Sequence, residues 1–132
     1  MSVKIMLEKA LAVREEAYAP YSKFKVGAVV KTMNNKFFTG CNVENNSYGL
    51  SICAERAAIF TAISQGEKEL SELLVVADDK EPVAPCGACR QVMIEFSIKT
   101  VHMANVQGQV ETYLLEDLLP VAFVKEDFNN NE

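Results

Sequence analysis

The sequence contains one histidine, no tryptophan, six glycines and four prolines among its 132 residues. With His102 as the one histidine, a serine or cysteine nucleophile would have a single candidate base in the whole chain. The glycines and prolines form no linker, and no repeat or low-complexity tract interrupts the chain. We therefore expect one domain spanning residues 1–132.

Positive charge is also scarce, because 13 Lys and Arg face 18 Asp and Glu and leave a net charge of −5. An acidic chain without a basic run is poorly suited to bind a phosphate backbone, so a nucleic acid polymer is not an expected partner. No apolar run approaches the roughly 20 residues that cross a bilayer, and the N-terminus lacks the apolar core of a secretion signal. We expect a cytoplasmic protein with no membrane partner.

Hydrophobic residues make up 49% of the chain and charged residues 23%, a balance typical of globular proteins. Apolar spacing predicts a helix that ends before Pro20, and Gly66 is expected to end the second helix. The helices are predicted at 3–18, 53–64, from 85–87 to about 96, and 114–119, and the strands at 24–30, 36–43, 73–77, 100–105 and 109–113. This order predicts a single-domain α/β layered sandwich in which helices flank a mixed five-stranded β-sheet; the polar tail 129–132 is expected to fray.

Three of the four cysteines lie where predicted helices begin. Cys53 opens the second helix, and Cys86 and Cys89 form a C-x-x-C pair at the start of the third. Free N–H groups and the helix dipole at such positions stabilise thiolates. If the two helix starts meet, three soft ligands favour Zn²⁺ and leave one tetrahedral position open for water, as in a catalytic site.

Two charged residues follow Cys53 within the first helical turn. Glu55 is placed to reach a water on the metal without being a ligand, and could carry a proton from that water to a substrate. Three thiolates on Zn²⁺ leave the site with a net charge of −1. Arg56 is the predicted partner that hydrogen-bonds the sulfurs and offsets this charge.

The motifs at 53–56, Cys-Ala-Glu-Arg, and 85–91, Pro-Cys-Gly-Ala-Cys-Arg-Gln, resemble those of the small, homotetrameric, zinc-dependent cytidine deaminases. The family's zinc signature has a histidine where this chain has Cys53, so the chain resembles the three-cysteine variant. The resemblance extends over nearly the whole chain, through the segments at 18–24, 27–28, 40–45 and 118–123. One departure is Ala84, where the family usually has a serine-like residue.

The resemblance implies a cytidine deaminase-like fold, one Zn²⁺ per subunit, and hydrolytic deamination of cytidine and deoxycytidine to uridine and deoxyuridine in pyrimidine salvage. The partner is then a small nucleoside, and ammonia is the second product. The resemblance also implies a homotetramer in which neighbouring subunits complete each active site. At this size, shared sites would add buried surface that a lone domain lacks.

The resemblance also assigns roles to individual residues. Zinc would be held by Cys53, Cys86 and Cys89, and Glu55 would be the catalytic proton carrier, protonating N3 and then the leaving amino group. The substrate-binding residues would be Phe24, Asn42, Val43, Glu44, Tyr48, Ala54 and Phe123, with Tyr48 and Phe123 entering from neighbouring subunits. Alternation along a strand agrees with part of this, since Asn42 and Glu44 are two positions apart and face the same side.

Other readings of the same residues remain open. Cys86 and Cys89 alone are compatible with a redox pair or with half of a structural zinc site, for which Cys41 or His102 would have to supply the fourth ligand. The chain would then be a zinc-stabilised binding module without turnover. Within enzymes, blasticidin-type deaminases share the three-cysteine framework and act on a bulkier cytosine nucleoside analogue. A polynucleotide-editing deaminase is disfavoured by the acidic charge.

Overall fold

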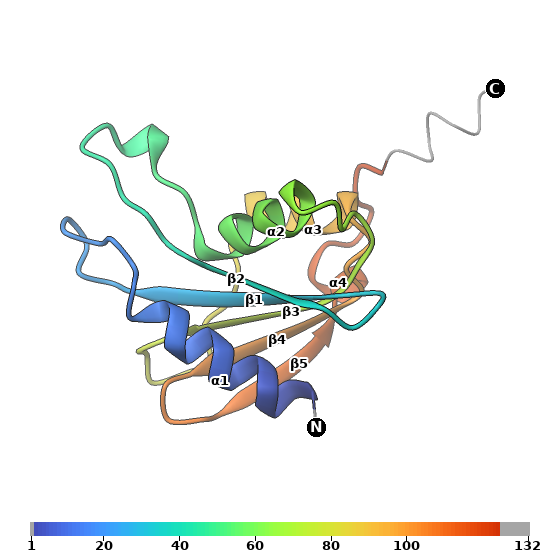
Figure 1. Cartoon of the computed structure of the whole chain (residues 1–132), viewed down its shortest axis with the longest axis horizontal. Helices are drawn as coiled ribbons and strands as arrows, with labels where there is room; N and C mark the ends of the chain where they lie inside the picture. Colours follow the sequence, from blue (N-terminus) through green and yellow to red (C-terminus); the bar gives the residue numbers. More distant parts are fainter. Residues whose placement is uncertain (1, 125–132) are drawn as a thin grey trace.

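A computed structural model describes residues 2–124 and has a five-stranded sheet. Helices lie on both faces of this sheet (Figure 1). The helices are α1 (Ser2–Arg14), α2 (Ala54–Ser64), α3 (Gly87–Glu95) and α4 (Leu115–Leu118), with a short 3₁₀ helix, η1 (Tyr48–Leu50). The strands are β1 (Val26–Thr32), β2 (Phe37–Cys41), β3 (Leu70–Ala77), β4 (Thr100–Asn105) and β5 (Val110–Leu114). The predicted order of elements and the layered α/β class are confirmed; the tail 129–132 lies outside the described residues.

The sheet is mixed, as predicted, with strand order β2-β1-β3-β4-β5. β3 and β4 run parallel, and the other three neighbouring pairs are antiparallel. β3 lies at the centre, and its last five residues, 73–77, are all buried. This agrees with the continuous apolar run there, which is typical of a strand covered on both faces.

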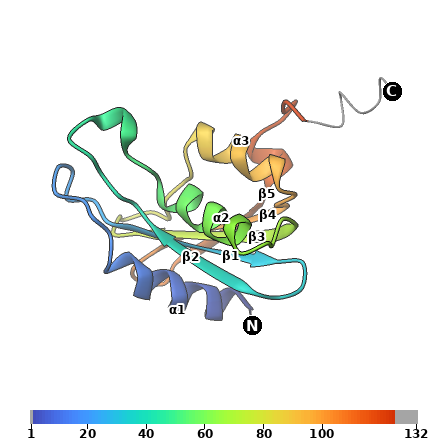
Figure 2. The same ribbon diagram turned by 45° about the horizontal axis from the view of Figure 1, so that its top comes forward.

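Helices cover opposite faces of the sheet, α1 on one face and α2 and α3 on the other (Figure 2). A layer of apolar side chains lies between the helices and the sheet on each face. On one face, Met6 and Ala10 of α1 pack with Val29, Leu74 and Val76. On the other face, α2, α3 and α4 pack against the remaining inward side chains of β1, β3 and β4. That larger core includes Ala28, Val30, Ala58, Ile59, Leu73, Val75, Met93, Val101 and Leu115. The cysteine-bearing helices α2 and α3 therefore share one face of the sheet.

The first helix is shorter than predicted. The prediction extended it to residue 18, but α1 ends at Arg14. Tyr18 instead forms a bridge with Val43, since its N–H donates to the Asn42 carbonyl at 3.0 Å and its own carbonyl accepts from Glu44 at 2.8 Å. These long-range bonds outweigh the local helical preference of residues 15–18.

The predicted strands are present, but several boundaries were wrong. β1 starts two residues later than predicted, β2 is three residues shorter, and β3 begins three residues earlier, at Leu70. Residues 42–44 leave the ladder because they pair with Tyr18 and Ile52 instead. The 3₁₀ helix was not predicted, whereas Gly66 does follow the end of α2 with the left-handed φ of +89° expected of a helix-ending glycine. Among the described residues, no helix is long and apolar enough to cross a membrane.

The position of α2 on the sheet depends on the close approach of its backbone to Gly40 of β2. A Cβ placed on Gly40 would lie 2.3 Å from the backbone nitrogen of Ala58 and 2.7 Å from the carbonyl carbon of Ala57. Neither backbone atom can rotate away. The absence of a side chain at this position therefore allows the helix that follows Cys53 to lie directly on the sheet.

We expect Gly40→Ala to lower the free energy of unfolding by about 1–3 kcal/mol or more, because the helix must shift to admit the methyl group. Gly49→Ala is the matched control, since a Cβ there meets nothing within 4 Å. The control should stay within about 0.5 kcal/mol of the parent. Urea unfolding of the parent and the two variants measures both effects. Equal stability of the two variants would contradict the proposed close packing of α2 on Gly40.

Candidate metal and nucleoside site

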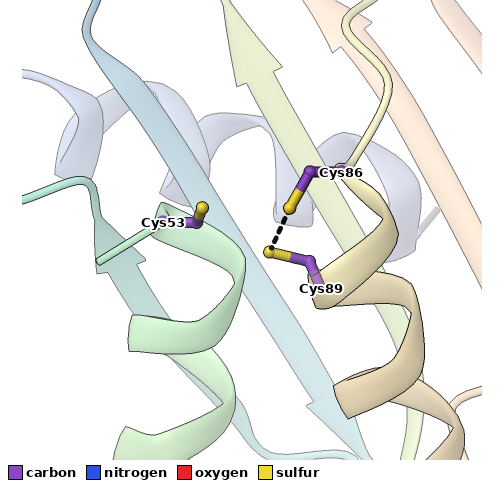
Figure 3. A group of neighbouring side chains, drawn as sticks. All are labelled: Cys53, Cys86 and Cys89. Atoms are coloured by element: carbon purple, nitrogen blue, oxygen red, sulfur yellow. Dashed lines mark hydrogen bonds between the residues drawn. The ribbon is translucent and has the colours of Figure 1, made fainter. Parts of the chain in front are cut away.

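The N-termini of α2 and α3 meet and bring three cysteine side chains together (Figure 3). Cys53 and Cys86 are the residues immediately before these helices, both with extended backbones, and Cys89 lies in the first turn of α3. The three sulfur atoms lie within 4.8 Å of one another, and the Cys86 and Cys89 sulfurs are 3.4 Å apart. The predicted meeting of the two helix starts is therefore confirmed.

Arg56 supplies positive charge beside these sulfurs. Its Nη2 donates a hydrogen bond to the Cys53 sulfur at 3.3 Å. Its Nε is buried and has no hydrogen-bond partner among the described residues. A guanidinium in this position favours thiolates, which agrees with the charge-offsetting role predicted for Arg56.

The thiols do not share their protons equally. A hydrogen bond from the Cys89 thiol, reinforced by Arg56, lowers the pKa of Cys53 to about 5 against the opposing effect of partial burial. The hydrogen bond to Cys53 raises the pKa of Cys89, and burial raises it further. Of Cys53 and Cys89, Cys53 is therefore the one that more readily becomes a thiolate.

The donor set fits a zinc ion with an open position. Among the described residues, no further histidine, cysteine or acidic side chain joins the three sulfurs in a metal-binding group. His102 is buried and hydrogen-bonded to Glu72 at 2.7 Å and to Thr112 at 2.8 Å, and alternation along β4 places it on the α1 face of the sheet. Cys41 also stands apart. The fourth ligand that a closed structural site would require is therefore not supplied by either residue.

Glu55 is the buried carboxyl group of the site. It is 5% exposed and lines the same cavity as Cys53 and Cys86. Burial disfavours its charged form and raises its pKa to about 7, with a smaller contribution from the neighbouring Cys53 thiolate. A carboxyl group of this kind beside metal-binding sulfurs is suited to accept and return protons.

The cavity over these residues has a volume of about 290 Å³, close to the lower end of the range for small-molecule sites. Four of the predicted substrate-binding residues line it, namely Phe24, Asn42, Glu44 and Ala54. The sequence did not identify the remaining lining residues, which are Val26, Ser51, Ile52, Val75, Val83 and Ala84. Most of these are ordinary apolar positions, and no local pattern distinguishes them from core residues.

Asn42 and Glu44 face the cavity, as alternation predicted, although β2 has already ended at Cys41. Asn42 Oδ1 accepts from the Val26 N–H at 2.9 Å, and its Nδ2 donates to the Phe24 carbonyl at 2.8 Å. Each amide atom therefore keeps capacity for one more hydrogen bond. Asn42 also fixes the start of β1 against the end of β2.

Glu44 is held by the loop that precedes β1. Its carboxylate accepts from the Tyr21 and Ser22 N–H groups, both at 3.0 Å, and from the Ser22 hydroxyl. The Ser22 hydroxyl bond is the main cause of a lowered pKa at Glu44, so the group is a carboxylate at neutral pH. Ser22 was part of the motif at 18–24 but received no role from the sequence.

The other three residues predicted to contact substrate do not line this cavity in a single copy of the chain. Val43 is 44% exposed, and its backbone is paired with Ile52. Tyr48 is 75% exposed and stacks edge-on against Tyr21, with ring centroids 5.9 Å apart. Phe123 is 67% exposed and lies beyond α4. The predicted entry of Tyr48 and Phe123 from neighbouring subunits is compatible with their exposure.

Comparison with known proteins agrees with the site. The model of the family described as "Cytidine and deoxycytidylate deaminase zinc-binding region" matches residues 2–105. The chain belongs to this family. Its three sulfurs, Glu55 and Arg56 all lie within the matched segment, so the zinc-binding character and the deaminase fold of the family apply to this part of the chain.

Full-length relatives and solved structures of this family extend the match. A cytidine deaminase of Halalkalibacterium halodurans is 45% identical, over 98% of this chain and 100% of that protein. The crystal structure of a cytidine deaminase from Burkholderia pseudomallei superposes with a TM-score of 0.89 at 50% identity, covering 93% of this chain and 100% of that one. A blasticidin-S deaminase of Bacillus cereus is 24% identical, over 93% of this chain and 90% of that protein.

Proposed function

We propose that the protein catalyses the zinc-dependent hydrolytic deamination of cytidine and deoxycytidine, which gives uridine and deoxyuridine with release of ammonia. The observation that carries this proposal is the buried Glu55 beside three converging cysteine sulfurs, in a cavity that Asn42 and Glu44 also line. Glu55 and the cysteine sulfurs provide hydrolytic chemistry at a metal. Asn42 and Glu44 provide polar groups that can bind a sugar.

The metal would be held by Cys53, Cys86 and Cys89. When bound, zinc in a three-ligand site supplies the activation of a water molecule for attack on C4 of the cytosine ring. Arg56 offsets the charge of the three thiolates through its contact with the Cys53 sulfur. Without this offset, three thiolates would weaken the acidifying effect of the metal on water.

Glu55 moves the protons of the reaction. Its carboxylate accepts one proton from the attacking water and donates it to N3 of the ring. It then takes the second proton of that water, which has become the hydroxyl on C4, and delivers it to the amino group that leaves as ammonia. General acid–base catalysis of this kind contributes on the order of 10²–10⁴-fold to a rate. The backbone N–H of Ala54, in the first position of α2, is not used by the helix and is proposed to bind the carbonyl oxygen of the base.

The nucleoside is oriented by three side chains of the cavity wall. Asn42 and Glu44 retain hydrogen-bonding capacity for the ribose hydroxyls after their internal bonds are counted. Phe24 packs on the pyrimidine ring from the same wall. Val43, between the two polar residues, contributes through its backbone pairing, which keeps their side chains on the cavity side.

A substrate panel tests the proposal. Purified zinc-loaded protein is incubated separately with cytidine, deoxycytidine, free cytosine and blasticidin S, and ammonia release is followed, with Glu55→Ala as the control. We expect release from both nucleosides and none from the control. Release from blasticidin S alone would assign the chain to the blasticidin-type enzymes. Tightly bound zinc without release from any substrate would make the metal structural and the protein a binding module.

We further propose that the active protein is a homotetramer in which Tyr48 and Phe123 complete the sites of neighbouring copies. Figure 1 shows η1 on a connection that projects away from the sheet, and Tyr48 and Leu50 on it are 75% and 72% exposed. Large apolar side chains exposed together on a projecting segment are typical of an interface between proteins.

Light scattering should give a mass about four times the 14.6 kDa of one chain. Tyr48→Ala, which removes an exposed ring from η1, should raise KM for cytidine. A mass near 14.6 kDa with full activity would contradict the shared-site arrangement.

The cellular setting is proposed on similar grounds. All four cysteines are free thiols, which suits the reducing cytoplasm better than an oxidising compartment. We propose that the protein acts there in pyrimidine salvage.

A further inference from the structure

The segment that follows α4 contains a strained turn, which we call the C-terminal turn (residues 118–123). At its centre Val121 has φ of +52°, in the left-handed region, and its side chain is fully exposed. A β-branched residue rarely adopts this conformation, because its Cβ substituents clash with the backbone. Such a conformation persists only where the surrounding structure holds it.

Two adjacent side chains of α3 hold this turn from both sides. Arg90 Nη1 donates to the Leu118 carbonyl at 2.9 Å, and Gln91 Nε2 donates to the Phe123 carbonyl at 2.7 Å. The two carbonyls bracket Val121. Figure 2 shows the chain beyond α4 passing close to α3, in agreement with these bonds.

Arg90 also connects the turn to the metal site. Its Nε donates to the carbonyl of Pro85 at 3.0 Å, immediately before Cys86. Pro85 is buried, so this carbonyl has little access to water. One guanidinium thus joins the loop that carries a metal-binding cysteine to the residue that ends α4.

We propose that Arg90 and Gln91 are positioning residues that keep the C-terminal turn in its strained shape. They thereby fix the direction in which Phe123 points relative to α3, the helix that carries Cys89. This inference rests on the proposed function in one respect, that the Phe123 ring contacts the nucleoside bound by a neighbouring copy. A ring placed by a flexible chain would lose conformational freedom on each binding event, whereas a ring held in place does not. Gln91 therefore acts on substrate affinity through Phe123 and not on the chemical step.

The test uses Gln91→Met, which keeps the size of the side chain and removes the donor to the Phe123 carbonyl. We expect KM for cytidine to rise about three- to tenfold, in the range of a lost aromatic contact, with kcat and zinc content unchanged. Chymotryptic cleavage within 118–123, followed by mass spectrometry, should become faster in the same variant. Gln107→Met, in the exposed turn between β4 and β5, is the matched control and should change neither.

A second variant distinguishes the loss of the hydrogen bond to the Phe123 carbonyl from a loss of side-chain packing. Val121→Asn added to Gln91→Met should return KM toward the parent value, since asparagine adopts the left-handed conformation more readily than valine. Unchanged KM and cleavage in Gln91→Met would overturn the proposal, as would loss of kcat or zinc with KM unaffected. Absence of deaminase activity in the parent would instead overturn the proposed function, and the cleavage rates would still decide whether Gln91 holds the turn.

Discussion

Glu55→Gln should retain one zinc per chain and lose at least about 10²–10⁴-fold in kcat for cytidine. The substitution keeps the size and burial of the side chain, which is 5% exposed, and leaves the three sulfurs in place. It removes the group that accepts the proton of the attacking water and returns it to the substrate. Because several proton transfers depend on Glu55, kcat and kcat/KM should fall together, and added substrate should not restore the rate.

The measurement combines steady-state ammonia release with metal analysis of the same protein samples. Glu67→Gln is a suitable control, since Glu67 pairs with Lys36 at 3.2 Å on the surface and has no contact with the cavity. The control should turn over at the parent rate. Near-parental kcat in Glu55→Gln, with zinc retained, would remove Glu55 from the proposed chemistry.

Cys89→Ser should have the second large effect, through loss of the metal. Cys89 is fully buried, and its sulfur is 3.4 Å from that of Cys86, so a serine in its place brings a neutral hydroxyl that binds Zn²⁺ poorly. Zinc affinity should fall by more than the roughly 10–100-fold that changes to groups outside the ligand shell produce. Turnover should fall in proportion to the zinc retained.

Cys41→Ser provides the matched comparison, because Cys41 is also a free thiol but does not belong to the three-sulfur group. It should keep one zinc per chain after dialysis against a weak chelator, whereas Cys89→Ser should lose it. Full zinc content and full turnover in Cys89→Ser would show that Cys89 is not a ligand.

The metal site was predictable because its geometry is local. A cysteine immediately before a helix and another in its first turn have little freedom in where their sulfurs point. The meeting of the two helix starts was implied by the resemblance to the cytidine deaminases and not by this spacing. Asn42 and Glu44 were predictable for a similar reason, since alternate residues of an extended chain share a face. In both cases spacing in the sequence translates directly into direction in space.

Features set by distant contacts were not predictable in this way. The end of α1 is decided by bonds between Tyr18 and residues 42–44, which lie more than 20 positions away. The role of Ser22 depends on its bonds to Glu44, and those of Arg90 and Gln91 on the chain beyond α4. These residues lie in the motifs at 18–24 and 85–91, but their local sequence does not show which distant group each one contacts. Only the folded chain reveals that partner.

The most direct test of the central claim is the zinc dependence of cytidine turnover in a single preparation. Ammonia release from cytidine is measured in the purified protein, again after zinc has been removed with a chelator, and a third time after one equivalent of Zn²⁺ per chain is restored. The account predicts rapid release, loss of release, and recovery. Release that persists without zinc, or that is absent in fully zinc-loaded protein, would contradict it.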